Sequence, residues 1–262
     1  MSTADPWAHL RRLTAARIAL GRAGVSLPTA EWLRFAQAHA LARDAVHEPL
    51  DAEALLRGLR DAAFDAVRVE SAAPDRATYL RRPDLGRRLS PRSAALLQGQ
   101  RSDGIAVVLA DGLSARATQA HALPLLLALR PRLEAQGQAI GSVAVATQAR
   151  VALGDEAAAL LQAPAVLLLI GERPGLSSPD SLGAYLTWAP RAAPAGRRDA
   201  ERNCVSNIRP EGLALETAAH KIAWLLQAAR ALGATGVVLK DESDAPLLAD
   251  NARMSIARDK AP

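Results

Sequence analysis

The chain has few cysteines and few aromatic residues, and each scarcity excludes a class of protein. Its 262 residues include one cysteine, Cys204, and 3% aromatic residues. One cysteine excludes an internal disulfide framework and a multi-cysteine zinc site, and it is typical of a reducing compartment. No run approaches the roughly 20 apolar residues that cross a bilayer, and the first residues lack the apolar run of a secretory signal. We therefore expect a cytoplasmic protein that does not enter a membrane.

A concentrated basic patch is also missing. The 32 basic residues exceed the 27 acidic ones by five. The basic residues are nearly all arginine, because lysine occurs only at Lys221, Lys240 and Lys260, and they are interspersed with Asp and Glu. With so few aromatic side chains, platforms for stacking bases are scarce as well. The composition argues against nucleic-acid binding.

Common nucleotide and metal motifs do not occur. The chain has neither a GxGxxG fingerprint nor a GxxxxGK[ST] loop, so no motif supports a dinucleotide or P-loop site. His39 and His47 lie eight residues apart on an expected helix, which is too far for the adjacent-turn pairing of a helical zinc site. No spaced pair of carboxylates indicates acid–base hydrolysis.

The first hundred residues have mainly helical patterns. Residues 28–46 have helical spacing behind Pro28, and a second helix is expected after Asp51, a good N-cap. Residues 67–71 alternate briefly like a strand, residues 74–89 have the composition of a loop, and Ser90 starts another helix. Residues 7–20 could form an amphipathic helix. We expect a helical N-terminal region over residues 1–100.

From Ile105 onward, aliphatic strands alternate with helices. Strands are expected at 105–110, 141–147, 164–170, 184–188 and 235–240. Helices are expected from Ser114, as N-cap, to about Leu129, after Asp155, and over 215–232. Uninterrupted aliphatic strands joined by helices are typical of a parallel sheet covered on both faces. The pattern predicts an α/β domain over 101–262 with a doubly wound, mainly parallel, Rossmann-like sheet; the tail from Asp244 has no clear pattern.

Two loops beyond these strands contain candidate site residues. Residues 171–178 combine glycines and a proline with Glu172 and Arg173, which suits a binding loop and an ordinary strand-to-helix turn about equally. Cys204 lies among polar residues. None of the five histidines is close to it in sequence, so an inert thiol is the preferred interpretation over a nucleophile.

Longer motifs resemble one family. LIGERPGLSSPDSLGAYLTWAP (169–190) and DAERNCVSNIR (199–209) are similar to the small subunit of ethanolamine ammonia-lyase. The resemblance continues through ARIALGRAGVSLPT (16–29), AHALARDAVHEPLD (38–51), TYLRRPDLGRRL (78–89) and ADGLSARA (110–117). It covers nearly the whole chain, and the motifs follow in the right order.

The resemblance implies a cofactor and site residues. In that family the small subunit covers adenosylcobalamin from one side, while a barrel-shaped large subunit holds ethanolamine and the catalytic side chains. The positions carried over as cofactor contacts are Val151, Glu172 and Cys204, each expected after a strand. No catalytic residue and no metal ligand is expected on this chain. Because no Asp-x-His-x-x-Gly stretch occurs, the cofactor is expected to keep its own base on cobalt, with no histidine ligand from the protein.

The same resemblance implies a partner. The expected assembly is a hetero-oligomer with the large subunit, docked through residues 1–100 and inactive without it, either free in the cytoplasm or inside a bacterial microcompartment. Two other classes stay open on the residues alone: a self-sufficient α/β enzyme that uses a nucleotide or a small metabolite, and an interaction or nucleic-acid-binding module.

Overall fold

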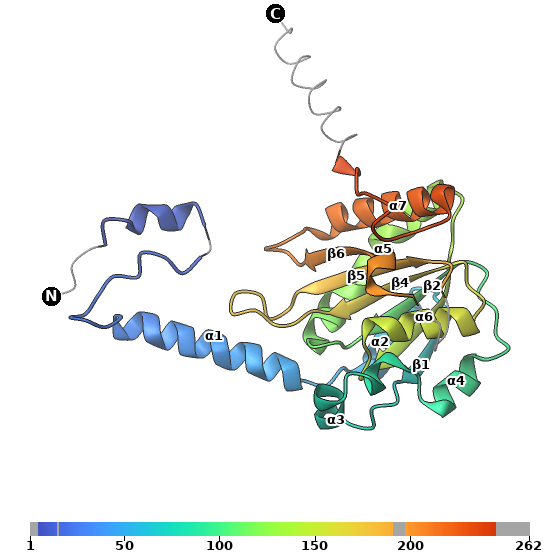
Figure 1. The fold of residues 1–262 in the computed structure, drawn as a ribbon, viewed down its shortest axis with the longest axis horizontal. Coiled ribbons are helices and arrows are strands. Elements are labelled where there is room, and N and C mark those ends of the chain that lie inside the picture. Colours follow the sequence, from blue (N-terminus) through green and yellow to red (C-terminus); the bar gives the residue numbers. More distant parts are fainter. Residues whose placement is uncertain (1–4, 15, 191–196, 245–262) are drawn as a thin grey trace, which may run out of the picture.

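The computed structural model describes residues 5–14, 16–190 and 197–244 as one sheet flanked by helices, with an N-terminal arm (Figure 1). In chain order, the elements of these residues are η1 (Ala8–Arg12), α1 (Thr29–His47), α2 (Ala52–Asp61), β1 (Ala66–Glu70), α3 (Arg76–Arg81), η2 (Leu85–Arg87), α4 (Pro91–Leu97), β2 (Ile105–Ala110), α5 (Ala115–Ala135), β3 (Ile140–Thr147), α6 (Val151–Leu160), β4 (Ala165–Gly171), β5 (Leu182–Trp188), η3 (Asp199–Glu201), β6 (Asn203–Ile208) and α7 (Leu215–Leu232).

The six-stranded sheet is mixed, with strand order β1-β3-β2-β4-β5-β6. The first four strands in this order pair in parallel, and β5 pairs antiparallel with both β4 and β6. The expected α/β class is confirmed, but the doubly wound, mainly parallel, Rossmann-like arrangement is not, because the sheet is mixed. The connection between β4 and β5 contains no helix, so the chain returns antiparallel instead of crossing over.

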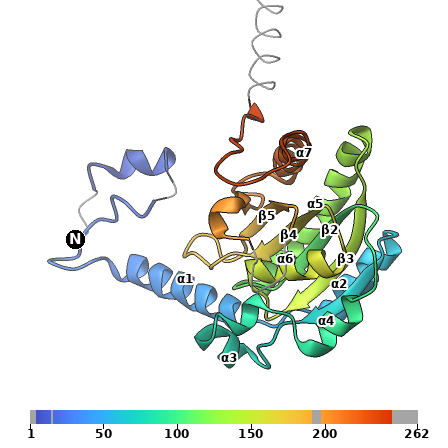
Figure 2. The same cartoon turned by 45° about the vertical axis from the view of Figure 1, so that its right-hand side comes forward.

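Helices cover the two faces of the sheet unequally. Side chains of α2, α5 and α7 pack on one face, and α7 covers β5 and β6 there. On the opposite face, α4 and α6 pack over the parallel strands. Figure 2 shows the strands of the sheet lying among these helices. β2 and β4 are buried along their whole length, which explains their unbroken aliphatic sequences. In the part of the chain that the structure describes, α4 and α6 leave most of the face of β5 and β6 opposite α7 uncovered, although Tyr185 packs against their hydrophobic cluster.

Local signals predicted many boundaries correctly. The side chains of Asp51, Ser90 and Ser114 each accept a hydrogen bond from the backbone three residues on, as N-caps do. The strands expected at 105–110, 141–147, 164–170 and 184–188 are present within two residues of their expected ends.

Other predictions were wrong. Residues 235–240 form a turn, not a strand: Gly236 has φ +91°, and its backbone N–H donates to Asn203 Oδ1 at 2.8 Å. That interaction holds the segment beside β6, a strand that the sequence pattern did not predict. The loop expected at 74–89 contains α3 and η2, and the amphipathic helix expected over 7–20 is the short η1. The helix expected after Asp155 begins earlier, at Val151. Asp155 lies within this helix and forms an ion pair with Arg202 instead of capping the helix.

The N-terminal arm extends away from the sheet (Figure 1). In α1 only Ala45 is buried, while Trp32, Leu33 and Phe35 are about half exposed or more. The division near residue 100 and the docking role of residues 1–100 stay predictions, although β1 precedes that boundary and lies in the sheet. The tail from 245 and residues 191–196 fall outside the described residues. No helix among the described residues is long and apolar enough to span a membrane.

Candidate functional site

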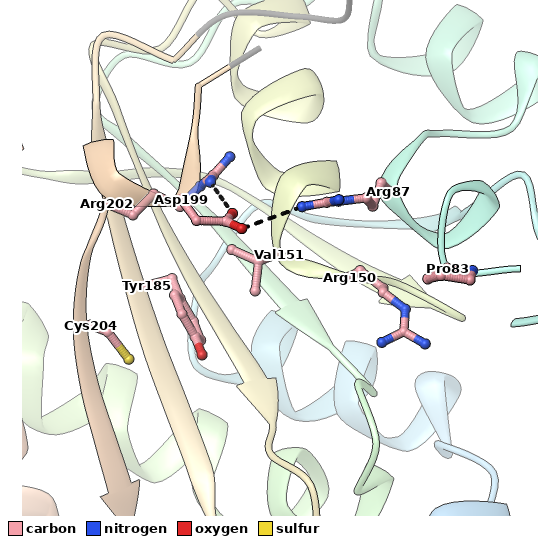
Figure 3. A pocket seen from close by; sticks show the side chains of 8 residues that line it. All are labelled: Pro83, Arg87, Arg150, Val151, Tyr185, Asp199, Arg202 and Cys204. Carbon is pink, nitrogen blue, oxygen red and sulfur yellow. Dashed lines mark hydrogen bonds and ion pairs between the residues drawn. The ribbon is translucent and has the colours of Figure 1, made fainter. Parts of the chain in front are cut away.

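Two adjoining cavities lie where α6 begins, beside the uncovered face of β5 and β6. Their volumes are roughly 460 Å³ and 440 Å³, and Arg150, Val151 and Tyr185 line both. Figure 3 shows the lining of the first cavity. The other lining residues of the first are Pro83, Arg87, Asp199, Arg202 and Cys204, and those of the second are Tyr79, Gly112, Leu113, Ile170, Gly171, Glu172 and Arg173. We call these two cavities together the wall site.

The antiparallel part of the sheet forms one side of the wall site. Tyr185 on β5 lies directly opposite Cys204 on β6. Side chains alternate between the faces of a strand, so Cys204 points to the opposite face from its neighbour Val205, which is buried on the α7 side, while Cys204 is exposed. A register shift against β5 lies between Val205 and Ile208, and both belong to the core on the α7 side. The side chains of Tyr185 and Cys204 therefore face the open cavity.

The amino end of α6 forms the floor of the wall site. Val151 is its first residue, and no acidic residue or side-chain cap occupies the first turn. Gly154, one turn on, packs so closely that an added Cβ would lie 2.9 Å from Leu168 Cδ1. Tight packing on β4 thus places the half-buried side chain of Val151 at the cavity edge.

Glu172 is held at the end of β4 by the residues around it. Its Oε2 accepts hydrogen bonds from Ser181 Oγ and, at 3.1 Å, from the backbone N–H of Asn207. A Cβ on Gly183 would lie 2.9 Å from Glu172 Oε1, so glycine leaves room for the carboxylate. Oε1 has no hydrogen-bond donor among the described residues and is available to a ligand with amide or hydroxyl donors.

Ion pairs fix the upper rim of the site. Arg202, whose side chain is 3% exposed, bonds to buried Asp155 and, at 2.6 Å, to Asp199. Arg87 reaches Asp199 at 3.5 Å, as the dashed lines in Figure 3 show. Separating the buried Arg202–Asp155 pair would leave an uncompensated charge. The pair therefore holds the start of β6 against α6.

The electrostatics of the site do not favour a nucleophile. Burial, and then the negative charge of Glu172, raise the pKa of Cys204, so the thiol is protonated at neutral pH even though the residue is exposed. Burial also raises the pKa of Tyr185, with Cys204 and Glu172 adding to the effect. Burial raises the pKa of Tyr79 to about 12. All three groups present neutral surfaces.

A third cavity, of roughly 520 Å³, lies by the ends of β1 and β3 and is lined in part by His47, Arg76 and Asp111. None of the sequence-predicted site residues lines it. Among the described residues, no group of three or more His, Cys, Asp or Glu side chains is arranged to hold a metal ion.

The structure brings the three sequence-predicted residues together. Val151, Glu172 and Cys204 all line the wall site around Tyr185. Val151 and Glu172 follow strands as expected, but Cys204 lies within β6, so its expected place after a strand was wrong. Their contact with a cofactor stays a prediction.

The sequence predicted Arg173 in the binding loop but neither tyrosine of the site, nor Arg87, Arg150 and Arg202. The chain has only two tyrosines, Tyr79 and Tyr185, and both line the second cavity. Because aromatic residues are so few in this chain, the two tyrosines could have been singled out from the sequence as candidate site residues. These three arginines gave no signal, because they are among many in the sequence.

Comparison with known proteins assigns the family. Residues 4–240 match the family model described as ethanolamine ammonia-lyase light chain. The chain is 54% identical over 248 residues to an ethanolamine ammonia-lyase small subunit of Azotobacter vinelandii, covering 93% of this chain and 91% of that protein. Small subunits of Xanthomonas campestris and Pseudomonas aeruginosa are 53% and 50% identical, over 93% and 96% of this chain and 90% and 93% of their own lengths. The chain thus belongs to the ethanolamine ammonia-lyase light chain family.

Proposed function

We propose that this chain is the small subunit of an adenosylcobalamin-dependent ethanolamine ammonia-lyase, and that its wall site closes one side of the cobalamin site against a large catalytic subunit. The family makes the chain a subunit of a lyase. The observation that supports the cofactor role is the convergence of Val151, Glu172 and Cys204 on one open wall.

The residues present fit a flat, amide-fringed ligand such as a corrin. The ring of Tyr185 and the side chain of Val151 offer apolar contact, and Cys204 adds a small, soft surface. Glu172 Oε1 can accept hydrogen bonds from amide donors on the ligand periphery. When bound, adenosylcobalamin supplies the radical chemistry that converts ethanolamine to acetaldehyde and ammonia. In this proposal the cofactor keeps its own base on cobalt.

The proposed partner explains the N-terminal arm. Trp32, Leu33, Phe35 and Leu41 are exposed on α1, and large apolar surfaces of this kind are typical of permanent interfaces. We assign the arm to docking on the large subunit. The assembly would reside in the cytoplasm, with a bacterial microcompartment as the alternative location.

The primary test is reconstitution. Purified chain is mixed with a purified large subunit, ethanolamine and adenosylcobalamin, and acetaldehyde is measured. Turnover that requires both chains is the expected result. Turnover by either chain alone, or an active large subunit that gains nothing from this chain, would contradict the proposal.

Glu172 provides a sharper test of the wall. Glu172→Ala should weaken adenosylcobalamin binding to the assembled complex about tenfold or more, because hydrogen bonds to a charged acceptor contribute roughly 1.5–3 kcal/mol. Equilibrium dialysis read by cobalamin absorbance gives the affinity, and size-exclusion chromatography confirms assembly. Glu172→Gln, which keeps an acceptor oxygen, should lose less, and Glu216→Ala on the far side of α7 is the matched control. Unchanged affinity in an assembled Glu172→Ala complex would remove Glu172 from the site.

A further inference from the structure

Arg150 is a charged side chain of the wall site that has no carboxylate partner among the described residues. Arg202 and Arg87 both reach Asp199, whereas Arg150 forms no ion pair with any described residue. Its one donated side-chain hydrogen bond runs from Nη2 to the Tyr79 carbonyl at 3.3 Å, and its buried Nε has no acceptor in the described part of the chain. A guanidinium carries five N–H groups. Most of the donor capacity of Arg150 is therefore unused.

Packing fixes where this charge lies. The Arg150 backbone N–H donates to the Gly86 carbonyl at 2.8 Å, and a Cβ on Gly86 would lie 3.0 Å from Arg150 Cγ. The guanidinium carbon lies 4.5 Å from the centroid of the Tyr79 ring. Figure 3 shows Arg87 pointing to Asp199, while Arg150 points away from it. The Arg150 guanidinium is positioned in advance, so little conformational entropy is lost when it binds a ligand.

The helix that follows adds to the same field. Arg150 is the N-cap residue of α6, and its side chain makes no cap hydrogen bond. The backbone N–H groups of Val151 and Ala152 have no acceptor among the described residues. The amino end of a helix carries partial positive charge and favours anions. Both the side chain and the helix therefore favour a negative group at the border between the two cavities.

We propose that Arg150, together with the amino end of α6, binds the phosphodiester in the nucleotide loop of cobalamin. This inference depends on the proposed function. The amides around a corrin are neutral, and the phosphodiester is the one anionic group on the periphery of the cofactor. Arginine binds phosphate oxygens through parallel N–H donors, which a lysine cannot reproduce. Arg150 thereby orients the nucleotide loop against the wall.

The test compares two corrinoids on the assembled complex. Adenosylcobinamide lacks the nucleotide loop and its phosphodiester, whereas adenosylcobalamin has both. Arg150→Gln should raise the Kd of adenosylcobalamin about tenfold or more and leave that of adenosylcobinamide within about twofold. Arg150→Lys, which keeps the charge but not the fork, should lie between. Arg132→Gln, on α5 at the opposite face of the sheet, is the matched control and should change neither Kd.

A second measurement reads the phosphate directly. The ³¹P resonance of bound cobalamin should differ from that of the free cofactor in the wild-type complex, and in the Arg150→Lys complex it should move toward the free position. Inorganic phosphate should compete with cobalamin and not with cobinamide. Phosphate that binds together with cobalamin would instead indicate a site for a free anion, and it would overturn the assignment.

The outcomes separate this inference from the function on which it depends. A wild-type complex that binds neither corrinoid contradicts the proposed function. A wild-type complex that binds cobalamin, with Arg150 variants that weaken both corrinoids equally or neither, overturns the phosphodiester assignment and leaves the function standing. If Arg150→Gln does not assemble, Arg150→Lys provides the same comparison, and an unchanged cobalamin affinity together with an unchanged ³¹P position in that variant would refute the phosphodiester assignment.

Discussion

At the scale of single residues, surroundings decide what a reactive group does. Cys204 on β6 lies opposite Tyr185 on the neighbouring strand β5, and Glu172 contributes negative charge near the Cys204 thiol. Both burial and that charge disfavour the thiolate, which is the reactive form. The sequence already favoured an inert thiol over a nucleophile, and its raised pKa agrees with a contact role.

This position gives a pH-dependent prediction. Cys204 is the single cysteine, so alkylation by iodoacetamide reports it alone. A raised pKa leaves less thiolate at a given pH. In the isolated chain, the alkylation rate should therefore reach half its maximum above pH 9.0, the ordinary pKa of a cysteine thiol. Near pH 8 the folded chain should be alkylated more slowly than the same chain unfolded in urea. Mass spectrometry across a pH series measures it. A folded chain that reacts as fast as the unfolded one would contradict the raised pKa.

At the scale of elements, close backbone approach sets the edge of the sheet. The end of β4 touches the turn between β2 and α5, where a Cβ on Gly171 would lie 1.9 Å from the Ser114 carbonyl oxygen. The backbone N–H of Leu113 donates to the Gly171 carbonyl at 2.9 Å. Since the clash is with backbone and not with a flexible side chain, only glycine fits. This contact places Glu172, the next residue, at the wall site.

Gly171→Ala should therefore destabilise the chain by more than about 3 kcal/mol, beyond the usual range of single substitutions. Urea unfolding followed by circular dichroism gives the free energy. Gly233→Ala, which strains a helix-ending glycine with φ +71° but meets no neighbour within 4 Å, is the graded control and should cost about 1 kcal/mol. Equal losses in the two variants would contradict the close-approach argument.

At the scale of the whole molecule, the chain divides unevenly between a packed sheet and an exposed arm. The core lies around β2, β3 and β4, and α1 contributes only Ala45 to the buried set. Arg17 bonds to the Leu176 carbonyl at 3.2 Å, an exposed contact that adds little stability. The arm therefore contributes little to the stability of the folded chain, which agrees with a role in binding a partner.

Removal of residues 1–41 should separate folding from assembly. The truncated chain keeps Val46, whose carbonyl accepts a hydrogen bond from Arg76, and should unfold within about 2 °C of the full chain, because little buried surface is lost. Its affinity for the large subunit, measured by titration calorimetry, should fall about tenfold or more. Undiminished affinity would show that the arm does not dock there.

The buried strands, the capped helices and, through long matching motifs, the family could all be predicted from the order of the residues. Those features depend on neighbours along the chain: aliphatic runs at β2 and β4, and cap residues such as Ser114. The two-residue periodicity of a strand contains no information on its direction, so the antiparallel turn of β5 was decided by tertiary structure. Val237 and Val238 resemble a strand in sequence yet are largely exposed, because the turn is fixed by Asn203, more than 30 residues away.

The wall site itself is a product of the tertiary structure. Tyr185 and Cys204 face a cavity because α6 stops short of β5 and β6 while α7 covers only their other face. Asp155 and Asp199 bind Arg202, and no described carboxylate pairs with Arg150. Neither fact follows from residue order, since each depends on which segments, distant in sequence, pack together and on which surface they leave uncovered.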